Sequence, residues 1–134
     1  MLEYVFDKTI CFLENMPKSA RKKKGQFFTS VETATYMAEM FDLNGLPASV
    51  DILDPGCGTG ILSAALIDRL QRETNIKKIF LTCYETDPDV IPVLRSNLIY
   101  IKKNASISFD FEIKKDDYIL SQAVSYTHLR AHET

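Results

Sequence analysis

Apolar and polar positions alternate with helical spacing over most of the N-terminal third of the chain. The spacing predicts an amphipathic helix over residues 2–15 and a second helix over roughly residues 30–43. Thr29 is the expected N-cap of the second helix, because Thr29 and Glu32 have the spacing of a capping box. A mostly apolar run predicts a short strand over residues 50–54. The residues expected on the buried face of the second helix are Val31, Ala34, Met37, Ala38 and Phe41.

The rest of the chain alternates between helical and strand patterns. We expect a helix over roughly residues 61–72, a strand over 79–84, and a strand over 107–113 whose apolar positions recur with period two. Another helix is expected over roughly residues 88–103, with Pro88 in its first turn. Strands that alternate with helices form a parallel, doubly wound sheet, so the predicted fold class is α/β.

The composition of the chain mainly excludes certain classes of protein and kinds of site. The chain has 134 residues, of which 46% are hydrophobic and 25% charged, and these ordinary globular values exclude a disordered tail, a fibre or a disulfide mini-protein. The net charge of −2 gives no overall signal for nucleic acid. No two of the three cysteines have metal-ligand spacing, so we expect reduced thiols, a cytoplasmic location and no metal site. No apolar run approaches the ~20 residues of a membrane span, so we expect no membrane partner.

The last eleven residues, 124–134, do not continue the preceding pattern. Their sequence resembles a translated sequencing adapter, so we expect this tail to be an artefact outside the native protein. Both histidines of the chain, His128 and His132, lie in the tail, which leaves none for catalysis or metal binding elsewhere. The expected organisation is therefore an N-terminal helical segment over residues 1–48 and a cofactor-binding part over residues 49–123.

A glycine-rich loop after the first strand carries the most specific chemistry. Three of the five glycines stand at Gly56, Gly58 and Gly60, where glycine permits a sharp turn and a close ligand approach. Ligands of open α/β sheets bind at the carboxyl ends of the strands. The G-x-G-x-G spacing and the preceding Asp54 disfavour a pyrophosphate and suit a cationic or neutral ligand. Glu85 ends the next strand, where a carboxylate can accept hydrogen bonds from both hydroxyls of a ribose.

Two segments carry a resemblance to a known family. Residues 54–60, Asp-Pro-Gly-Cys-Gly-Thr-Gly, resemble the first motif of class I S-adenosylmethionine-dependent methyltransferases. Residues 25–30, Gly-Gln-Phe-Phe-Thr-Ser, precede it, and the pair in this order resembles the N6-adenine DNA methyltransferases of restriction–modification systems, which usually have proline where this chain has Ser30. The resemblance covers roughly residues 18–120. It implies a Rossmann-like class I fold, truncated after about three strands and preceded by two N-terminal helices, with S-adenosyl-L-methionine as the cofactor.

The resemblance also implies roles for individual residues. Thr29 would help to hold the methionine end of the cofactor, and Asp54 with the loop backbone would line its methionine and ribose. Glu85 would bind the ribose hydroxyls. Asp117 matches the acid that receives the adenine amino group, and Asp116 is the alternative if the register slips by one residue. The implied cofactor-binding set is Thr29, Asp54, Pro55, Gly56, Cys57, Gly58, Thr59, Gly60, Glu85 and Asp117.

The family's catalytic tetrapeptide, Asn/Asp/Ser-Pro-Pro-aromatic, does not occur in this chain, which has no Pro-Pro pair. We therefore expect the cofactor-binding part of a longer enzyme, inactive alone, that methylates adenine N6 in double-stranded DNA, with a restriction subunit or fused nuclease as a further partner. The basic run over residues 21–24 is either a solvated segment or a contact to DNA phosphates. Without a fourth strand beside it, the strand over residues 50–54 would be an apolar edge that favours aggregation.

Several alternatives stay open. Enzymes that resemble this family and share its fold methylate RNA or a protein glutamine, so these substrates are alternatives to DNA. A dinucleotide-dependent oxidoreductase and a non-catalytic interaction module are alternatives from other functional classes. At the level of residues, the glycine loop could be a tight turn without a ligand, and Glu85 could only solvate a strand end. Asp116 and Asp117 could be turn residues. Phe27 and Phe28 are interpreted as walls of the core or of the cofactor site.

Overall fold

Three parallel strands and five helices make up the fold of the computed structural model, which describes residues 1–25 and 28–122. The strands lie side by side in the order β1-β2-β3, with Val50 opposite Ile79 and Ile79 opposite Phe109. The predicted α/β class with a parallel sheet is confirmed. The elements in chain order are α1 (Leu2–Glu14), α2 (Lys18–Gly25), α3 (Val31–Glu39), β1 (Ser49–Asp54), α4 (Ile61–Glu73), β2 (Lys78–Tyr84), α5 (Ile91–Asn104) and β3 (Ser108–Lys114).

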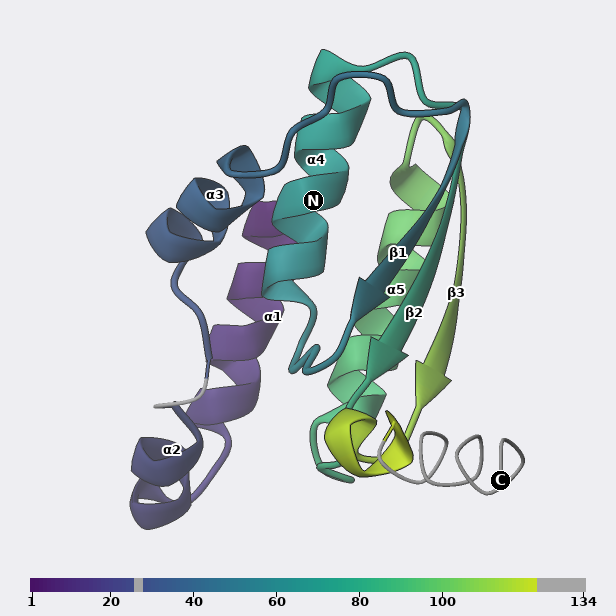
Figure 1. The fold of residues 1–134 in the computed structure, drawn as a ribbon. Coiled ribbons are helices and arrows are strands. Elements are labelled where there is room, and N and C mark those ends of the chain that lie inside the picture. The colour runs from purple at the N-terminus through teal and green to yellow at the C-terminus, as the bar shows by residue number, and fades with distance from the viewer. Residues whose placement is uncertain (26–27, 123–134) are drawn as a thin grey trace, which may run out of the picture.

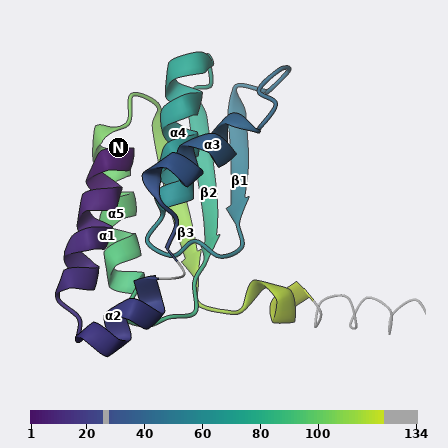
Figure 2. The ribbon, with the colours of Figure 1, turned by 90° about the vertical axis from the view of Figure 1, so that its left-hand side faces the viewer.

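All five helices lie on one side of the sheet, as the two ribbon views show (Figures 1 and 2). On that side the central strand β2 contributes Ile79, Leu81 and Cys83, which are fully buried. The alternate residues Phe80 and Thr82 point to the opposite face and are half-buried. The period-two pattern of β2 therefore separates a face covered by helices from a face that none of the helices α1 to α5 covers.

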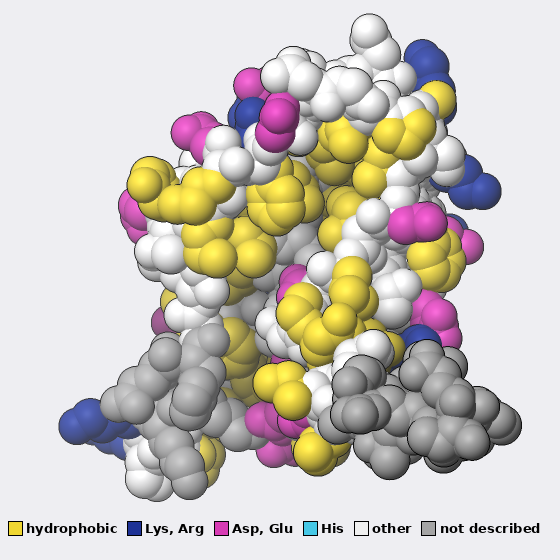
Figure 3. Space-filling model, viewed as in Figure 1, with side chains coloured by type: hydrophobic (Ala, Val, Ile, Leu, Met, Phe, Trp, Pro, Cys, Tyr) yellow, Lys and Arg dark blue, Asp and Glu magenta, His cyan; other side chains and the backbone are white. Residues whose placement is uncertain are grey.

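The outer edge of β1 is bordered by an apolar groove of about 390 Å³. Among the described strands, β1 pairs only with β2, and Leu53 on β1 is 50% exposed. Hydrophobic side chains gather on the face seen in Figure 3. This is the apolar edge expected from residues 50–54, and its tendency to aggregate stays a prediction. The apolar side chains lining the groove are Phe41, Leu43, Leu46, Val50, Ile52, Leu53, Pro55, Leu62, Leu66 and Leu70.

Helix α3 begins one residue later than predicted and is shorter. The N-cap is Ser30, not Thr29, because the Ser30 hydroxyl accepts a hydrogen bond from the Thr33 amide at 3.2 Å and also donates to the Thr33 hydroxyl at 2.9 Å. Ser30 thus makes the N-cap contact that was expected of Thr29. The predicted buried face was partly wrong, since Met37 is 39% exposed and Phe41, beyond the end of the helix, is 51% exposed.

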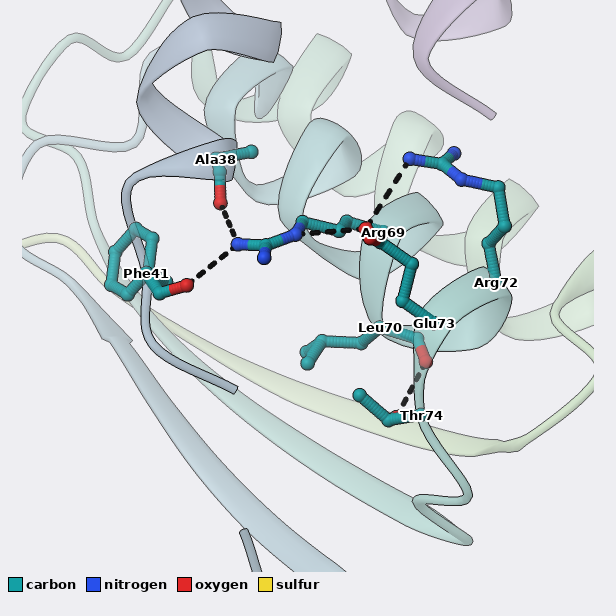
Figure 4. Close-up of polar contacts among 7 residues, drawn as sticks. All are labelled: Ala38, Phe41, Arg69, Leu70, Arg72, Glu73 and Thr74. Carbon is teal, nitrogen blue, oxygen red and sulfur yellow. Dashed lines mark hydrogen bonds and ion pairs between the residues drawn. The ribbon is translucent and has the colours of Figure 1, made fainter. Parts of the chain in front are cut away.

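The end of α3 is fixed by Arg69 of α4 (Figure 4). The Arg69 Nη1 atom donates to the carbonyl oxygens of Ala38 and Phe41, at 2.8 and 2.7 Å, and Nε donates to Glu73 at 2.8 Å. The Ala38 carbonyl belongs to the last turn of α3, whose carbonyls lack partners within the helix, and the Phe41 carbonyl lies just beyond that turn. The guanidinium donates to both and attracts the negative end of the helix dipole. This contact fixes the point at which the chain leaves α3 and holds α3 against α4.

Two further features of the helices differ from expectation. Helix α5 begins at Ile91, with Pro92 rather than Pro88 in its first turn, because the Asp87 carbonyl accepts from Val90 and Ile91 in a separate preceding turn. Helix α2 was not predicted, since its strongly basic sequence has no apolar face to mark it. None of the described helices has the length and apolar character needed to cross a membrane. The tail at 124–134, with both histidines, lies outside the described residues.

Candidate functional site

A pocket of about 520 Å³ lies at the carboxyl ends of the three strands. Because the strands are parallel, they all end at the lower edge of the sheet in Figure 1, and the segment after each strand contributes to the pocket. This is the place where ligands bind in open α/β sheets. The pocket is lined by Pro55, Gly56, Tyr84, Glu85, Thr86, Asp116, Asp117, Tyr118 and Ile119.

The glycine loop turns the chain from β1 into α4. Gly58 and Gly60 have φ values of +57° and +94°, a region that residues with a Cβ atom rarely adopt. The Gly60 amide donates to the Cys57 carbonyl, and the Cys57 amide donates to the Tyr84 carbonyl at the end of β2, both at 3.0 Å. Gly56 differs from the other two, because a Cβ atom there would project into open space.

Glu85 connects the glycine loop to the segment that follows β2. Its Oε1 atom accepts a hydrogen bond from the Gly58 amide at 2.8 Å, and Oε2 accepts from the Asp87 amide at 2.9 Å. A carboxylate has about four acceptor positions, so each oxygen can still accept a second hydrogen bond. Glu85 is half-buried and lines the pocket, so it is held rigidly with acceptor capacity left for two hydroxyl groups.

Asp54 holds the start of the loop through hydrogen bonds and does not line this pocket. Its Oδ2 atom accepts from the Ser63 hydroxyl at 2.8 Å, and Oδ1 accepts from the Gly56 amide at 3.3 Å. Asp54 is 9% exposed, so these hydrogen bonds replace most of its contact with water. The sequence did not point to Ser63, which has the same small polar character as many residues in a first helical turn.

Cys57 packs behind the loop against Cys83. The two sulfur atoms are 3.3 Å apart, and the Ser63 hydroxyl lies 3.9 Å from Cys57 Sγ. The hydrogen bond to Cys83, burial, and the nearby charge of Asp54 raise the pKa of the Cys57 thiol well above its ordinary value. A buried, protonated thiol is a weak nucleophile, which agrees with Cys57 as a small loop residue. The described residues contain free cysteines and no cluster that could hold a metal ion.

Both candidate acids after β3 lie in the pocket. Asp117 accepts from the Leu120 amide at 3.0 Å, which makes it the cap of a helical turn over residues 118–122. Asp116 and Asp117 are both exposed, and their assignment stays a prediction. Tyr118 packs edge-on against Tyr84, with ring centroids 5.1 Å apart, and gives the pocket an aromatic wall.

The upstream motif reaches the glycine loop through Phe28. A Cβ atom at Gly58 would lie 3.5 Å from Phe28 Cε1, so the ring covers this glycine closely. Phe28 also packs edge-on against Phe12 of α1, at 6.3 Å between centroids. Thr29 follows directly and is half-buried, but it is not part of the pocket lining. Phe27 lies outside the described residues.

Sequence reasoning missed two buried residues that contact the loop from the helices. Thr9 of α1 lies beside Thr59, and Asn97 of α5 donates to the Thr59 carbonyl. Each is a polar residue at a helix position that faces the core: Thr9 lies one turn after the buried Val5, and Asn97 lies between the buried Leu94 and Leu98. That departure from the apolar pattern was the available signal.

Comparisons with known proteins both match methyltransferases. The model of the family described as N-6 DNA Methylase matches residues 9–129 and so ends inside the 124–134 tail, whose origin stays a prediction. The chain is 30% identical over 112 residues to the ribosomal RNA small subunit methyltransferase A of Mesomycoplasma hyopneumoniae (strain 232). That match covers 79% of this chain but only 38% of the relative. Methyltransferase families of this kind generally use S-adenosylmethionine. Because the family model matches most of its length, the chain belongs to the N-6 DNA methylase family of methyltransferases.

Proposed function

We propose that the pocket at the strand ends binds S-adenosylmethionine for methyl transfer to N6 of adenine in DNA. The observation that carries the proposal is the position of Glu85. Its two oxygens are oriented by the Gly58 and Asp87 amides and retain the capacity to accept from both hydroxyls of a ribose. The open space at Gly56 leaves room for the rest of the ligand.

The other lining residues fit the same nucleoside. Tyr118 and Ile119 offer apolar surface to a base, and Asp117 or Asp116 can accept from an exocyclic amino group. Three carboxylates in one pocket repel a pyrophosphate but favour a ligand that carries a positive sulfonium. The charge of the pocket therefore supports this cofactor over the dinucleotide of an oxidoreductase.

When bound, the cofactor supplies a methyl group activated by the sulfonium. The described residues would hold the nucleoside part: Glu85 would fix the ribose, the loop backbone would approach it closely, and Asp54 would keep the loop in place. Under this proposal the tetrapeptide that receives the adenine belongs to residues outside this chain, because the chain has no Pro-Pro pair. An adenine in duplex DNA must also leave the base stack before it can react.

Double-stranded DNA is the proposed substrate, with a restriction subunit or fused nuclease as a further partner. The family description and the Gly-Gln-Phe-Phe-Thr-Ser segment at residues 25–30 support DNA. RNA is the second candidate, because the printed name of the 30% identical relative refers to ribosomal RNA. Both substrates would use the same cofactor pocket.

The test is methyl transfer by the full-length enzyme, with cofactor that carries tritium in its methyl group. Duplex DNA with adenines, the same duplex with every adenine replaced by N6-methyladenine, and a ribosomal RNA transcript serve as substrates. The proposal expects label on the adenine-containing duplex and none on the methylated duplex. Label on RNA alone would support the second candidate, and label on neither nucleic acid would contradict both.

A further inference from the structure

A series of buried hydrogen bonds joins the glycine loop to two helices that lie outside the pocket lining. Thr59, between Gly58 and Gly60, is 1% exposed, and its Oγ1 atom lies 2.6 Å from Oγ1 of Thr9 on α1. The carbonyl oxygen of Thr59 accepts from Nδ2 of Asn97 on α5 at 2.9 Å. One loop residue is therefore held by its side chain from α1 and by its backbone from α5.

The direction of the contact between the two hydroxyls follows from a count of hydrogens. Thr9 donates its single hydroxyl hydrogen to the carbonyl of Val5 at 2.8 Å, within α1. The hydrogen between the two threonines must then come from Thr59, with Thr9 as the acceptor. The acceptor lies on a helix, so the loop hydroxyl is oriented by a rigid element.

Burial of Asn97 lowers the stability of the fold, because one polar atom of its side chain lacks a hydrogen-bond partner among the described residues. Its side chain is fully buried, and among the described residues its Oδ1 atom has no hydrogen-bond partner. A buried acceptor without a partner is unfavourable, and an apolar residue of similar size would avoid that loss. The hydrogen bond from Nδ2 to the Thr59 carbonyl is an interaction with the loop that an apolar residue could not make.

The glycine loop needs such support because glycines leave its backbone free to adopt many conformations. The end of β2 holds one side of the loop, through Tyr84 and Glu85. We propose that Thr9 and Asn97 are positioning residues that hold the other side, at Thr59, in the shape that binds the cofactor. This inference rests on the proposed cofactor and makes α1 part of its binding apparatus, since a preorganised loop binds its ligand more tightly.

The test compares three variants of the full chain. Thr9→Val removes the hydroxyl at nearly constant volume, and Thr9→Ser retains it. Thr74→Val is the matched control, because the Thr74 hydroxyl makes the same kind of contact, to the Leu70 carbonyl four residues earlier at 2.6 Å, at the opposite end of α4 from the glycine loop. Two readouts are taken: amide hydrogen exchange at Gly58 and Gly60 without any nucleoside, and the calorimetric Kd for S-adenosylmethionine.

We expect Thr9→Val to accelerate exchange at the loop amides and to raise the Kd about five- to tenfold, the effect of one lost hydrogen bond. Thr9→Ser should stay within about twofold of the unsubstituted protein in both readouts. Thr74→Val should lower the melting temperature and change neither readout. If Thr9→Val does not fold, Asn97→Leu removes the hydrogen bond to the Thr59 carbonyl. It should likewise accelerate exchange at the loop amides and raise the Kd.

Loop exchange and Kd that respond no more to Thr9→Val or Asn97→Leu than to Thr74→Val would overturn the inference. A different outcome separates it from the proposed function. Loop exchange that accelerates in Thr9→Val, in a protein that binds no S-adenosylmethionine even without substitution, would support loop positioning and refute the cofactor assignment alone.

Discussion

Substitution of single glycines in the loop by alanine separates the role of the loop in folding from its role in binding. Gly60→Ala places a Cβ atom on a residue with φ of +94° and within 3.3 Å of Leu94 Cδ1. Gly56→Ala places one on a backbone without positive φ and with nothing within 4 Å. The same chemical change is therefore expected to destabilise the fold at one position and to obstruct the ligand at the other.

The magnitudes follow from these local geometries. At Gly60 the left-handed backbone costs about 1–2 kcal/mol for alanine, and the close approach to Leu94 adds about 1 kcal/mol of strain. Reduced freedom of the unfolded chain returns about 0.4–1 kcal/mol, which leaves a net loss of about 1–3 kcal/mol. Gly56→Ala should leave stability unchanged or raise it by up to about 1 kcal/mol. Because Gly56 lines the pocket, its new methyl group should weaken S-adenosylmethionine binding at least about tenfold.

Urea denaturation measures the stability of both variants, and calorimetric titration measures their binding. A loss of about 1–3 kcal/mol should lower the melting temperature by about 3–5 °C for each kcal/mol in a chain of this size. Equal stability losses in the two variants would refute the backbone argument. A Gly56→Ala variant that binds the cofactor as tightly as the unsubstituted protein would refute the assignment of the pocket.

Two further predictions concern the end of α3 and the buried thiol behind the glycine loop. Arg69→Ala removes the donor that satisfies the Ala38 and Phe41 carbonyls, so it should lower the free energy of unfolding in urea by about 1–3 kcal/mol. Arg72→Ala, which removes an exposed guanidinium 3.6 Å from Glu73, should change the free energy of unfolding by less than about 0.5 kcal/mol. Equal losses in the two variants would contradict the role of Arg69 at the end of α3. The pKa of Cys57 is raised in the folded state, so the unfolded state loses its thiol proton first, and this contribution to stability should be complete below about pH 8.5 and decline as pH rises further. Denaturation curves from pH 7 to 10 measure this decline, which Cys57→Ser should reduce, and an equal decline in that variant would contradict the assignment.

The helices and strands were largely predictable from the local pattern of apolar and polar residues. The three strands begin and end within one residue of the expected ranges, because their apolar runs are short and are separated by loops or strongly periodic helices. Helix starts were less predictable, since neighbouring residues such as Thr29 and Ser30 have similar capping propensity. The choice depends on which hydroxyl reaches Thr33 in the folded chain.

The placement of the candidate site residues was predictable where they are consecutive or end a strand. The loop glycines and Glu85 lie together at the strand ends, as expected from the parallel topology. The contacts of Thr9 and Asn97 with the glycine loop, and of Arg69 with the end of α3, were not predictable in this way. Each contacts a residue between 28 and 50 positions away in the sequence, and no local period records such a pairing.

Calorimetric titration of S-adenosylmethionine into the Glu85→Gln variant tests the central claim most directly. Glutamine would place an amide nitrogen opposite the Gly58 or Asp87 amide and would lose the charge-assisted contact to the ribose. Glu112→Gln, at an exposed position on β3, is the control. We predict a single site in the unsubstituted protein, a Kd raised about 10- to 100-fold by Glu85→Gln, and a change within about twofold for Glu112→Gln. Absence of binding to the unsubstituted protein, or equal affinity in all three proteins, would contradict the account.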